Sequence, residues 1–256
     1  IETLKAIHMT EFGYIYWGYR FVNMDASMGV WAGLVWVLLF YQTFVLLAFH
    51  YVYRYVMLCS PPWLASFRLN SWRNWLLVTL VADIIFVGGI FFACLFGFVP
   101  TEVSRASFAP VLGEVYNINL YAPNAPGFLA IVYWTITEDG RKEWIPSSLF
   151  IIGCICILFF ATALIILACM MLITLELRES RFAILAPSTK ALQKQLFHAL
   201  LWQTIIPCVT SYIPLAMVFL VPLTGLALDG FGTVFIMSTA LFPMLDPYIV
   251  IFLISG

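Results

Sequence analysis

Five long apolar stretches dominate the pattern of hydrophobic and polar positions along the chain. They cover residues 28–53, 75–99, 149–175, 199–222 and 231–254. A bilayer core about 30 Å thick requires about 20 apolar residues in a helix that rises about 1.5 Å per residue, and each stretch reaches that length. Lipid offers the backbone no hydrogen bonds, and the stretches lack the alternating polarity of barrel strands, so we expect helices. The pattern therefore predicts an all-α, polytopic transmembrane bundle with five spans, in one domain over residues 1–256.

The amino-acid composition favours a membrane protein over a water-soluble one. Apolar residues make up 63% of the 256 residues and charged residues 10%, whereas about a quarter of the residues in a soluble domain are charged. The formal net charge is −1, and without a basic surface we expect no nucleic-acid partner. Five cysteines lie inside apolar stretches and Cys59 lies beside one. We therefore expect buried thiols, with neither a disulfide framework nor a metal or other cofactor.

Positive charges cluster in two of the connections between the stretches. The loops after the first and third stretches contain Arg54, Arg68 and Arg73, and Arg178, Arg181, Lys190 and Lys194. The connection between the second and third stretches is instead predominantly acidic. The positive-inside rule therefore places the 176–198 loop and the C-terminus in the cytoplasm, and the 1–27 segment and the 100–146 loop outside. The aromatic residues of the 1–27 segment predict an interface belt on the outer side.

The 100–146 loop is too long for a mere connection in a compact bundle. It is rich in proline, asparagine and aromatic residues, and long loops of this kind often act as lids. We interpret it as a lid over the outer ends of the helices. A solvated, partly disordered surface loop is the alternative.

Two aspartates, Asp83 and Asp246, lie within the apolar stretches. An ionisable side chain in a span is costly unless it pairs or faces a wet interior, so both are functional candidates. For Asp83 the alternative is a carboxyl group that is hydrogen-bonded within the bundle, whereas Pro247 directly after Asp246 favours a switch. Two carboxyl groups that share a proton would also fit an intramembrane aspartyl protease, but Asp83 lacks the glycine-flanked context of such enzymes. His50 and Gln203 complete the intramembrane polar candidates.

Prolines interrupt the last two stretches. Pro207 and Pro214 lie in the fourth, and Pro243 and Pro247 lie in the fifth. Each proline removes a backbone hydrogen bond and kinks the helix, and a kinked helix can have two packings of similar energy. These prolines fit a conformational switch in a receptor, although transporters also use broken helices.

An arginine flanked by tyrosines lies at the end of the first stretch. Tyr53, Arg54 and Tyr55 are expected at the cytoplasmic interface, with His50 one turn earlier on the same helical face. Two interpretations stay open. One is a snorkelling arginine with aromatic anchors. The other is an arginine that stabilises an inactive packing and then swings out to contact a cytoplasmic partner.

Five motifs follow one another along the chain. They are HYVYRY at 50–55, CSP at 59–61, KQLFHALLWQTIIP at 194–207, YIP at 212–214 and FPMLDP at 242–247. In this combination and order they resemble the nematode serpentine chemoreceptors of the Str type. The resemblance implies a seven-helix G-protein-coupled receptor, whose helices three to seven correspond to the five stretches. The first two helices would then be missing, and residues 1–26 would be the end of the second helix and the first outer loop.

The resemblance also implies roles for two of these motifs. Tyr-Arg-Tyr at 53–55 would take the place of the acidic-Arg-Tyr motif that contacts the G protein, although the acidic neighbour is absent. Asp246-Pro247-Tyr248 would take the place of the proline-containing switch of the last helix. Many such receptors fasten the second outer loop by a disulfide, but the 100–146 loop contains no cysteine. Another interaction must therefore position it.

These observations predict a chemosensory receptor rather than an enzyme. We expect a small, volatile ligand to bind between the outer halves of the helices, beneath the 100–146 loop, with Trp31, Trp36 and Gln42 as pocket candidates. The receptor would signal to a heterotrimeric G protein from the plasma membrane of a chemosensory neuron cilium. The rival interpretation is an ion- or proton-coupled transporter or channel that uses Asp83 and Asp246. The inverted repeats typical of such proteins are not visible in the sequence.

Overall fold

A computed structural model gives the structure of most of the chain. The described residues are 7–17, 25–59, 71–137, 139–178, 187–228, 231, 232, 234, 235, 237, 238 and 248. The chain divides into two compact units, which we name the sheet unit and the helical unit. The sheet unit comprises Ile1–Leu38, Phe91–Ile155 and Pro207–Pro243, and the helical unit comprises Leu39–Ile90, Cys156–Ile206 and Met244–Gly256.

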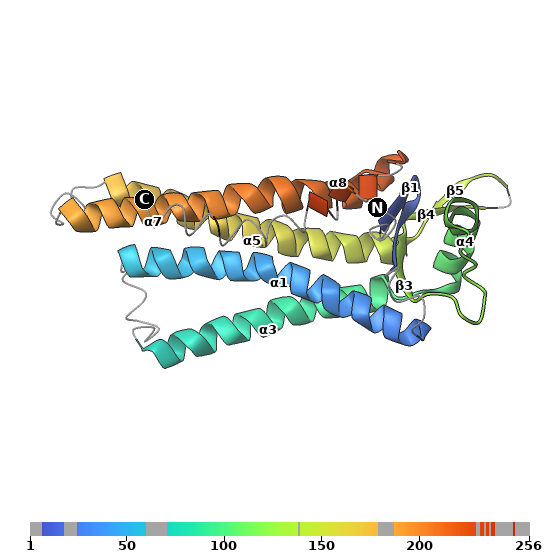
Figure 1. Cartoon of the computed structure of the whole chain (residues 1–256), viewed down its shortest axis with the longest axis horizontal. Helices are drawn as coiled ribbons and strands as arrows, with labels where there is room; N and C mark the ends of the chain where they lie inside the picture. The colour runs from blue at the N-terminus through green and yellow to red at the C-terminus, as the bar shows by residue number, and fades with distance from the viewer. Residues whose placement is uncertain are drawn as a thin grey trace. The chain divides into compact units, whose positions relative to one another are not determined.

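Long apolar helices account for most of the described chain (Figure 1). They are α1 (Ala26–Cys59), α3 (Trp72–Gly97), α5 (Pro146–Arg178) and α7 (Pro187–Pro207), and α7 continues through the π-helix η3 (Cys208–Tyr212) into α8 (Ile213–Leu220) and the 3-10 helix η4 (Pro222–Thr224). Within the described residues, four segments are long and apolar enough to cross a membrane: Ala26–Cys59, Trp72–Gly97, Pro146–Leu177 and Phe197–Thr224. They overlap the first four predicted spans. The fifth predicted span, 231–254, lies mostly outside the described residues.

The surface of α3 shows why these helices belong in lipid. Only 6% of its most apolar part is buried inside the protein. Large aliphatic side chains such as Leu77, Ile84 and Ile85 are exposed along it. A helix that is hydrophobic all round requires an apolar environment, and the hydrocarbon core of a bilayer supplies one.

A three-stranded antiparallel sheet forms the centre of the sheet unit. Its strands are β1 (Ile7–Thr10), β2 (Gly13–Trp17) and β3 (Phe128–Val132), in that order. Residues 11 and 12 form a tight turn between β1 and β2, because Thr10 pairs with Gly13. Gly13 is required where β2 meets β3, since a Cβ atom there would overlap the Ile131 carbonyl group. The sequence pattern predicted an aromatic interface belt in this region, and the resemblance implied the end of a helix followed by an outer loop. Residues 7–10 and 13–17 are strands instead.

The two faces of this sheet are both buried. Alternate residues of β2 and β3 pack with α4 (Glu102–Tyr116) in one apolar cluster, whose buried members are Ile15, Trp17, Phe108, Leu112, Leu120, Phe128, Ala130 and Val132. On the other face, the Tyr14 ring packs against Phe98 and Phe219, with centroids 5.9 and 5.8 Å away. The sheet therefore forms a middle layer between α4 and helix ends that belong to the same unit.

The 100–146 loop is an ordered part of the sheet unit. Apart from residue 138 it is fully described, and it forms α4, β3, β4 (Trp134–Ile136) and β5 (Lys142–Trp144), grouped together in Figure 1. Thr101 and Ser104 form a capping box at the start of α4. The Ala130 N–H donates to the Phe98 carbonyl at the end of α3, at 2.9 Å. Strand pairing and this backbone hydrogen bond thus position the 100–146 loop, which contains no cysteine.

The helical unit has a separate core of apolar side chains. Segments of α1, α5 and α7 meet in a cluster whose buried members are Leu47, Ala48, Tyr51, Ile166, Cys169, Ile173 and Phe197. Further along α1, Phe44 packs against Phe159 with ring centroids 4.9 Å apart. This unit contains the predicted Tyr-Arg-Tyr motif at 53–55.

Candidate functional site

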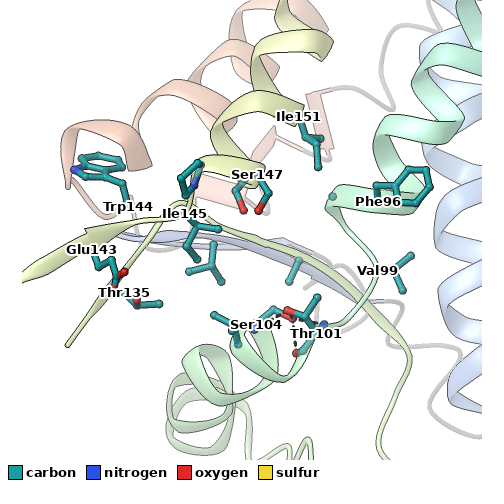
Figure 2. A pocket seen from close by; sticks show the side chains of 16 residues that line it. Phe96, Val99, Thr101, Ser104, Thr135, Glu143, Trp144, Ile145, Ser147 and Ile151 are labelled. Carbon is teal, nitrogen blue, oxygen red and sulfur yellow. Dashed lines mark hydrogen bonds between the residues drawn. The ribbon is translucent and has the colours of Figure 1, made fainter. Parts of the chain in front are cut away.

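A cavity of about 420 Å³ lies within the sheet unit, and Figure 2 shows its walls. Phe96 and Val99 come from the end of α3 and the turn that follows it, while Ser147 and Ile151 come from the start of α5. The capping pair at the start of α4 forms another wall, and β3, β4 and β5 complete the lining. A volume of this size falls in the range of small-molecule sites.

In the helical unit, a hydrogen bond between α1 and α7 lies beside the Tyr-Arg-Tyr motif. The Tyr51 hydroxyl group lies 2.6 Å from the Thr204 hydroxyl group of α7, and the Tyr51 side chain is fully buried. Arg54 lies one turn further along α1 and is half-buried. Tyr53 is exposed and its ring lies 6.1 Å from that of Trp75 in α3. A movement of α7 away from α1 would break the hydrogen bond next to Arg54.

Asp83 has a specific partner within the helical unit. The Gln42 side-chain amide of α1 donates to the Asp83 carboxyl group of α3 at 2.6 Å. Such a bond satisfies a polar group that would otherwise face hydrocarbon, and it links two helices. The contact fits the structural alternative for Asp83, a carboxyl group hydrogen-bonded within the bundle.

The fourth apolar stretch is broken between its two prolines. The π-helix η3 occupies Cys208–Tyr212, between Pro207 and Pro214. Pro214 has no N–H to donate to the carbonyl of Thr210, four residues earlier. The Ser238 hydroxyl group lies 2.9 Å from that carbonyl and 2.8 Å from the Phe235 carbonyl of its own segment, so its one proton is shared between the two acceptors. A hydroxyl group from the following segment therefore supports the break, and π-helical turns are frequent at functional sites.

The remaining predicted site residues are distributed over both units. Trp31 is exposed, and Trp36 stacks on Tyr16 with ring centroids 5.3 Å apart. Neither of them, nor Gln42, lines the cavity described above. His50 is exposed on α1 and Tyr248 is exposed and helical. The Gln203 and Pro207 side chains, together with Asp246 and Pro247, lie outside the described part of the structure.

The sheet provides one titratable group with an altered environment. The Tyr16 side chain lies between β2 and α1, against Trp36. Burial raises the pKa of the Tyr16 phenol above its ordinary value, because removal from water disfavours the phenolate. The phenol thus stays neutral where β2 meets α1.

The motifs, the apolar helices and the broken α7–η3–α8 segment can be compared with known proteins. A family model described as the serpentine type 7TM GPCR chemoreceptor Str matches residues 3–256. The chain belongs to this family. It is therefore a multi-pass membrane protein of a receptor class, as the resemblance predicted.

Three relatives extend the comparison. Serpentine receptor class r-10 of Caenorhabditis briggsae is 29% identical over 84% of this chain and 60% of its own length. Serpentine receptor class r-10 of Caenorhabditis elegans is 27% identical over 91% of this chain and 66% of its own length. G-protein coupled receptor str-33 of Caenorhabditis elegans is 26% identical over 81% of this chain and 59% of its own length. The chain thus spans about three-fifths of the length of these relatives, and no solved structure matches it.

Some residues of these sites were missed by the sequence reasoning. Tyr51 and Thr204 are far apart in the sequence, and a tyrosine and a threonine in apolar helices give no sign that they meet. Ser238 likewise follows no recognisable motif. The one available signal was the proline at 214, which predicts that a carbonyl four residues earlier needs another donor.

Proposed function

We propose that this chain acts as a chemosensory G-protein-coupled receptor. A small, volatile ligand binds on the outer side, and the receptor signals to a heterotrimeric G protein in the cytoplasm. It acts at the plasma membrane of a chemosensory neuron cilium, with the N-terminal segment outside. Membership of the Str family supports the receptor class, and the clusters of positive charge support the sidedness.

The observation that carries the proposal is the Tyr51–Thr204 hydrogen bond beside Arg54. It connects α1 to α7, and α7 leads directly into the π-helical break. A ligand shifts a two-state protein only by its differential affinity for the two states. In the proposed active state, α7 moves, the Tyr51–Thr204 bond opens, and Arg54 becomes accessible to the G protein. In this mechanism Tyr53 and Tyr55 flank the contact, and Asp246, Pro247 and Tyr248 belong to the switch.

Replacement of Arg54 tests the coupling. The full chain is reconstituted in lipid nanodiscs with a purified G protein, and nucleotide exchange is measured while a panel of volatile alcohols, esters, aldehydes and amines is added. At least one compound should accelerate exchange. Arg54→Ala should reduce this acceleration about tenfold, because a charged contact to the G protein is lost.

Arg73→Ala is the matched control. Arg73 is exposed near the start of α3, over the ring of Trp72, and it is assigned no part in coupling. This variant should keep the full response. Unchanged exchange in Arg54→Ala, with both variants equally well folded, would show that Arg54 does not couple to the G protein.

The transporter interpretation is not proposed. Its main support was a pair of intramembrane carboxyl groups. The hydrogen bond from the Gln42 amide already explains how the Asp83 carboxyl group is accommodated between the helices. The other carboxyl group, Asp246, lies outside the described residues.

A further inference from the structure

We propose that the cavity of the sheet unit is a binding site for a small, neutral, oxygen-bearing organic molecule such as an alcohol or an ester. The site differs from the one expected between the helices, since neither Trp31, Trp36 nor Gln42 lines it. It lies where the end of α3, the starts of α4 and α5, and the strands β3 to β5 meet. The inference deepens the proposed function and rests on it for the link to signalling. Binding itself is measured separately.

One wall of the cavity suits a hydrocarbon body. Val99 and Ile151 line the space from the α3 and α5 sides, and Phe96 lies at its edge with a largely exposed ring that points away from the middle (Figure 2). Val132 and Ile145 extend this surface along the strands. Burial of apolar ligand surface against such a wall contributes about 25 cal/mol per Å², which favours ligands with several carbon atoms.

Hydroxyl groups on two sides of the cavity suit an oxygen function. Figure 2 shows the Ser147 side chain at the α5 side and the Thr101–Ser104 pair across the space at the α4 side. The Ser104 hydroxyl group is already engaged, since it donates to the Thr101 carbonyl and accepts from the Thr101 N–H, both at 2.9 Å. The Ser147 and Ser148 hydroxyl groups have no hydrogen-bond partner among the described residues. They are the ones available to a ligand, as donors or acceptors.

The charge around the cavity selects against anions. Glu143 is the one charged residue in its lining, all of which the structure describes. The neighbouring Lys142 does not line the cavity, and its ammonium group lies 3.9 Å from the centroid of the Trp134 ring. A carboxylate ligand would therefore meet a like charge, whereas a neutral alcohol or ester would not.

The walls are fixed by backbone hydrogen bonds before a ligand arrives. Ala130 N–H donates to the Phe98 carbonyl at 2.9 Å, and Ile145 N–H donates to the Tyr133 carbonyl at 2.8 Å. A preformed site avoids the entropic cost of ordering its walls on binding. The Tyr133 hydroxyl group donates to the Phe219 carbonyl of α8 at 3.1 Å. Occupancy of the cavity is thus connected, through one residue, to the segment that follows the π-helical break.

Cysteine protection tests the site directly. Ser147→Cys is introduced into the full chain in nanodiscs, a charged methanethiosulfonate reagent is added, and labelling of the 147 peptide is followed by mass spectrometry. The probes are 1-hexanol and, at the same concentration, hexanoate at neutral pH. We expect 1-hexanol to slow labelling at least threefold and hexanoate to leave it unchanged.

Two further variants make the outcome decisive. Val115 lies on the exposed surface of α4 and does not line the cavity. Labelling of a Val115→Cys variant should therefore respond to neither probe. Val99→Phe, combined with Ser147→Cys, fills the cavity and should abolish protection. Equal slowing at 147 and 115, equal protection by hexanoate, or no protection at all would overturn the proposal. Protection without nucleotide exchange would instead refute the proposed function and leave the cavity assignment standing.

Discussion

The sheet unit and the helical unit are stabilised by different interactions. In the sheet unit, β2 pairs with β3 from a distant part of the sequence, and both faces of the sheet are buried. In the helical unit, apolar packing of α1, α5 and α7 is supplemented by isolated side-chain hydrogen bonds such as Tyr51–Thr204. Strand pairing with two buried faces permits a single register, whereas packed helices can shift between discrete arrangements. The comparison predicts a rigid sheet unit and a helical unit that can change conformation.

The largest expected effect comes from opening the core of the sheet unit. Trp17 is 1% exposed and packs edge-on against Tyr116, with centroids 4.9 Å apart. Trp17→Ala should cost about 4 kcal/mol of local stability, because truncation of a buried aromatic side chain leaves a cavity. Amide hydrogen exchange measured by mass spectrometry should show lost protection in the peptides that contain β1, β2 and β3.

Trp31→Ala is the control for this substitution, because Trp31 is 53% exposed. It should leave exchange in the strands unchanged. If Trp17→Ala lowered protection equally in the α1–α5–α7 core of the helical unit, the two units would not be independent in stability and the comparison would fail.

A smaller effect is expected where polar side chains join helices in the helical unit. A double-mutant cycle of Gln42→Leu and Asp83→Leu should give a coupling energy of about 1 kcal/mol, typical of interhelical hydrogen bonds in membranes. Resistance to unfolding in mixed detergent micelles measures it. Asp83→Asn keeps an acceptor for the Gln42 amide and should retain most of the stability. A coupling energy near zero would mean that the 2.6 Å contact contributes nothing.

Substitutions at the π-helical break should change stability by a similar or smaller amount. Ser238→Ala should cost about 1 kcal/mol, since the Thr210 carbonyl loses a hydroxyl donor. Pro214→Ala restores a backbone N–H at the position four residues after Thr210, so Ser238→Ala should cost less in that background. Thermal unfolding of the single and double variants measures both values. Ser27→Ala is the control: this exposed serine donates to the Asp25 carboxylate at 2.7 Å, far from the break, so its replacement should cost the same in both backgrounds. Equal costs of Ser238→Ala in both backgrounds would contradict this role of Ser238.

The smallest expected effect is a dependence of sheet-unit stability on alkaline pH. The pKa of Tyr16 is raised in the folded state by burial, so the unfolded chain loses this proton first. The stabilising contribution is complete below the ordinary tyrosine pKa of about 10 and is lost as the pH rises from there through the folded pKa. Tyr16→Phe should flatten this dependence, as measured by hydrogen exchange or unfolding between pH 9 and 11. Tyr121→Phe, at an exposed tyrosine, should not, and an identical pH profile for the two variants would rule out Tyr16.

The apolar helices were predictable because hydrocarbon length is a property of the sequence alone. Four of the five predicted spans overlap helices long and apolar enough to cross a membrane. The motif at 53–55 and the family also followed from the order of residues along the chain. The strands were harder to predict. The β1–β2 turn has Glu11 and Phe12 in place of the Asn-Gly or Asp-Gly pair that normally marks a two-residue hairpin.

A second signal for the sheet was present but ambiguous. Residues 128–132 (FLAIV) form a short apolar run directly after Pro126 and Gly127, which is compatible with a buried strand or with a piece of buried helix. Only a partner strand decides between these, and the partner begins at Gly13, far away in the sequence. The pocket candidates Trp31, Trp36 and Gln42 were chosen from their position along one helix. Such reasoning does not register that Trp36 stacks on Tyr16 and that Gln42 binds Asp83.

The sequence by itself determined which segments are long and apolar enough to cross a bilayer, the expected sidedness of the loops, and the receptor family. These properties depend on the length, polarity and order of residues that are neighbours in the chain. The tertiary structure alone decided that the 100–146 loop is held by strand pairing, that it lines a cavity together with the adjoining ends of α3 and α5, and that Tyr51 meets Thr204 beside Arg54. Such contacts join residues distant in sequence, and their energies depend on geometry that no local pattern encodes.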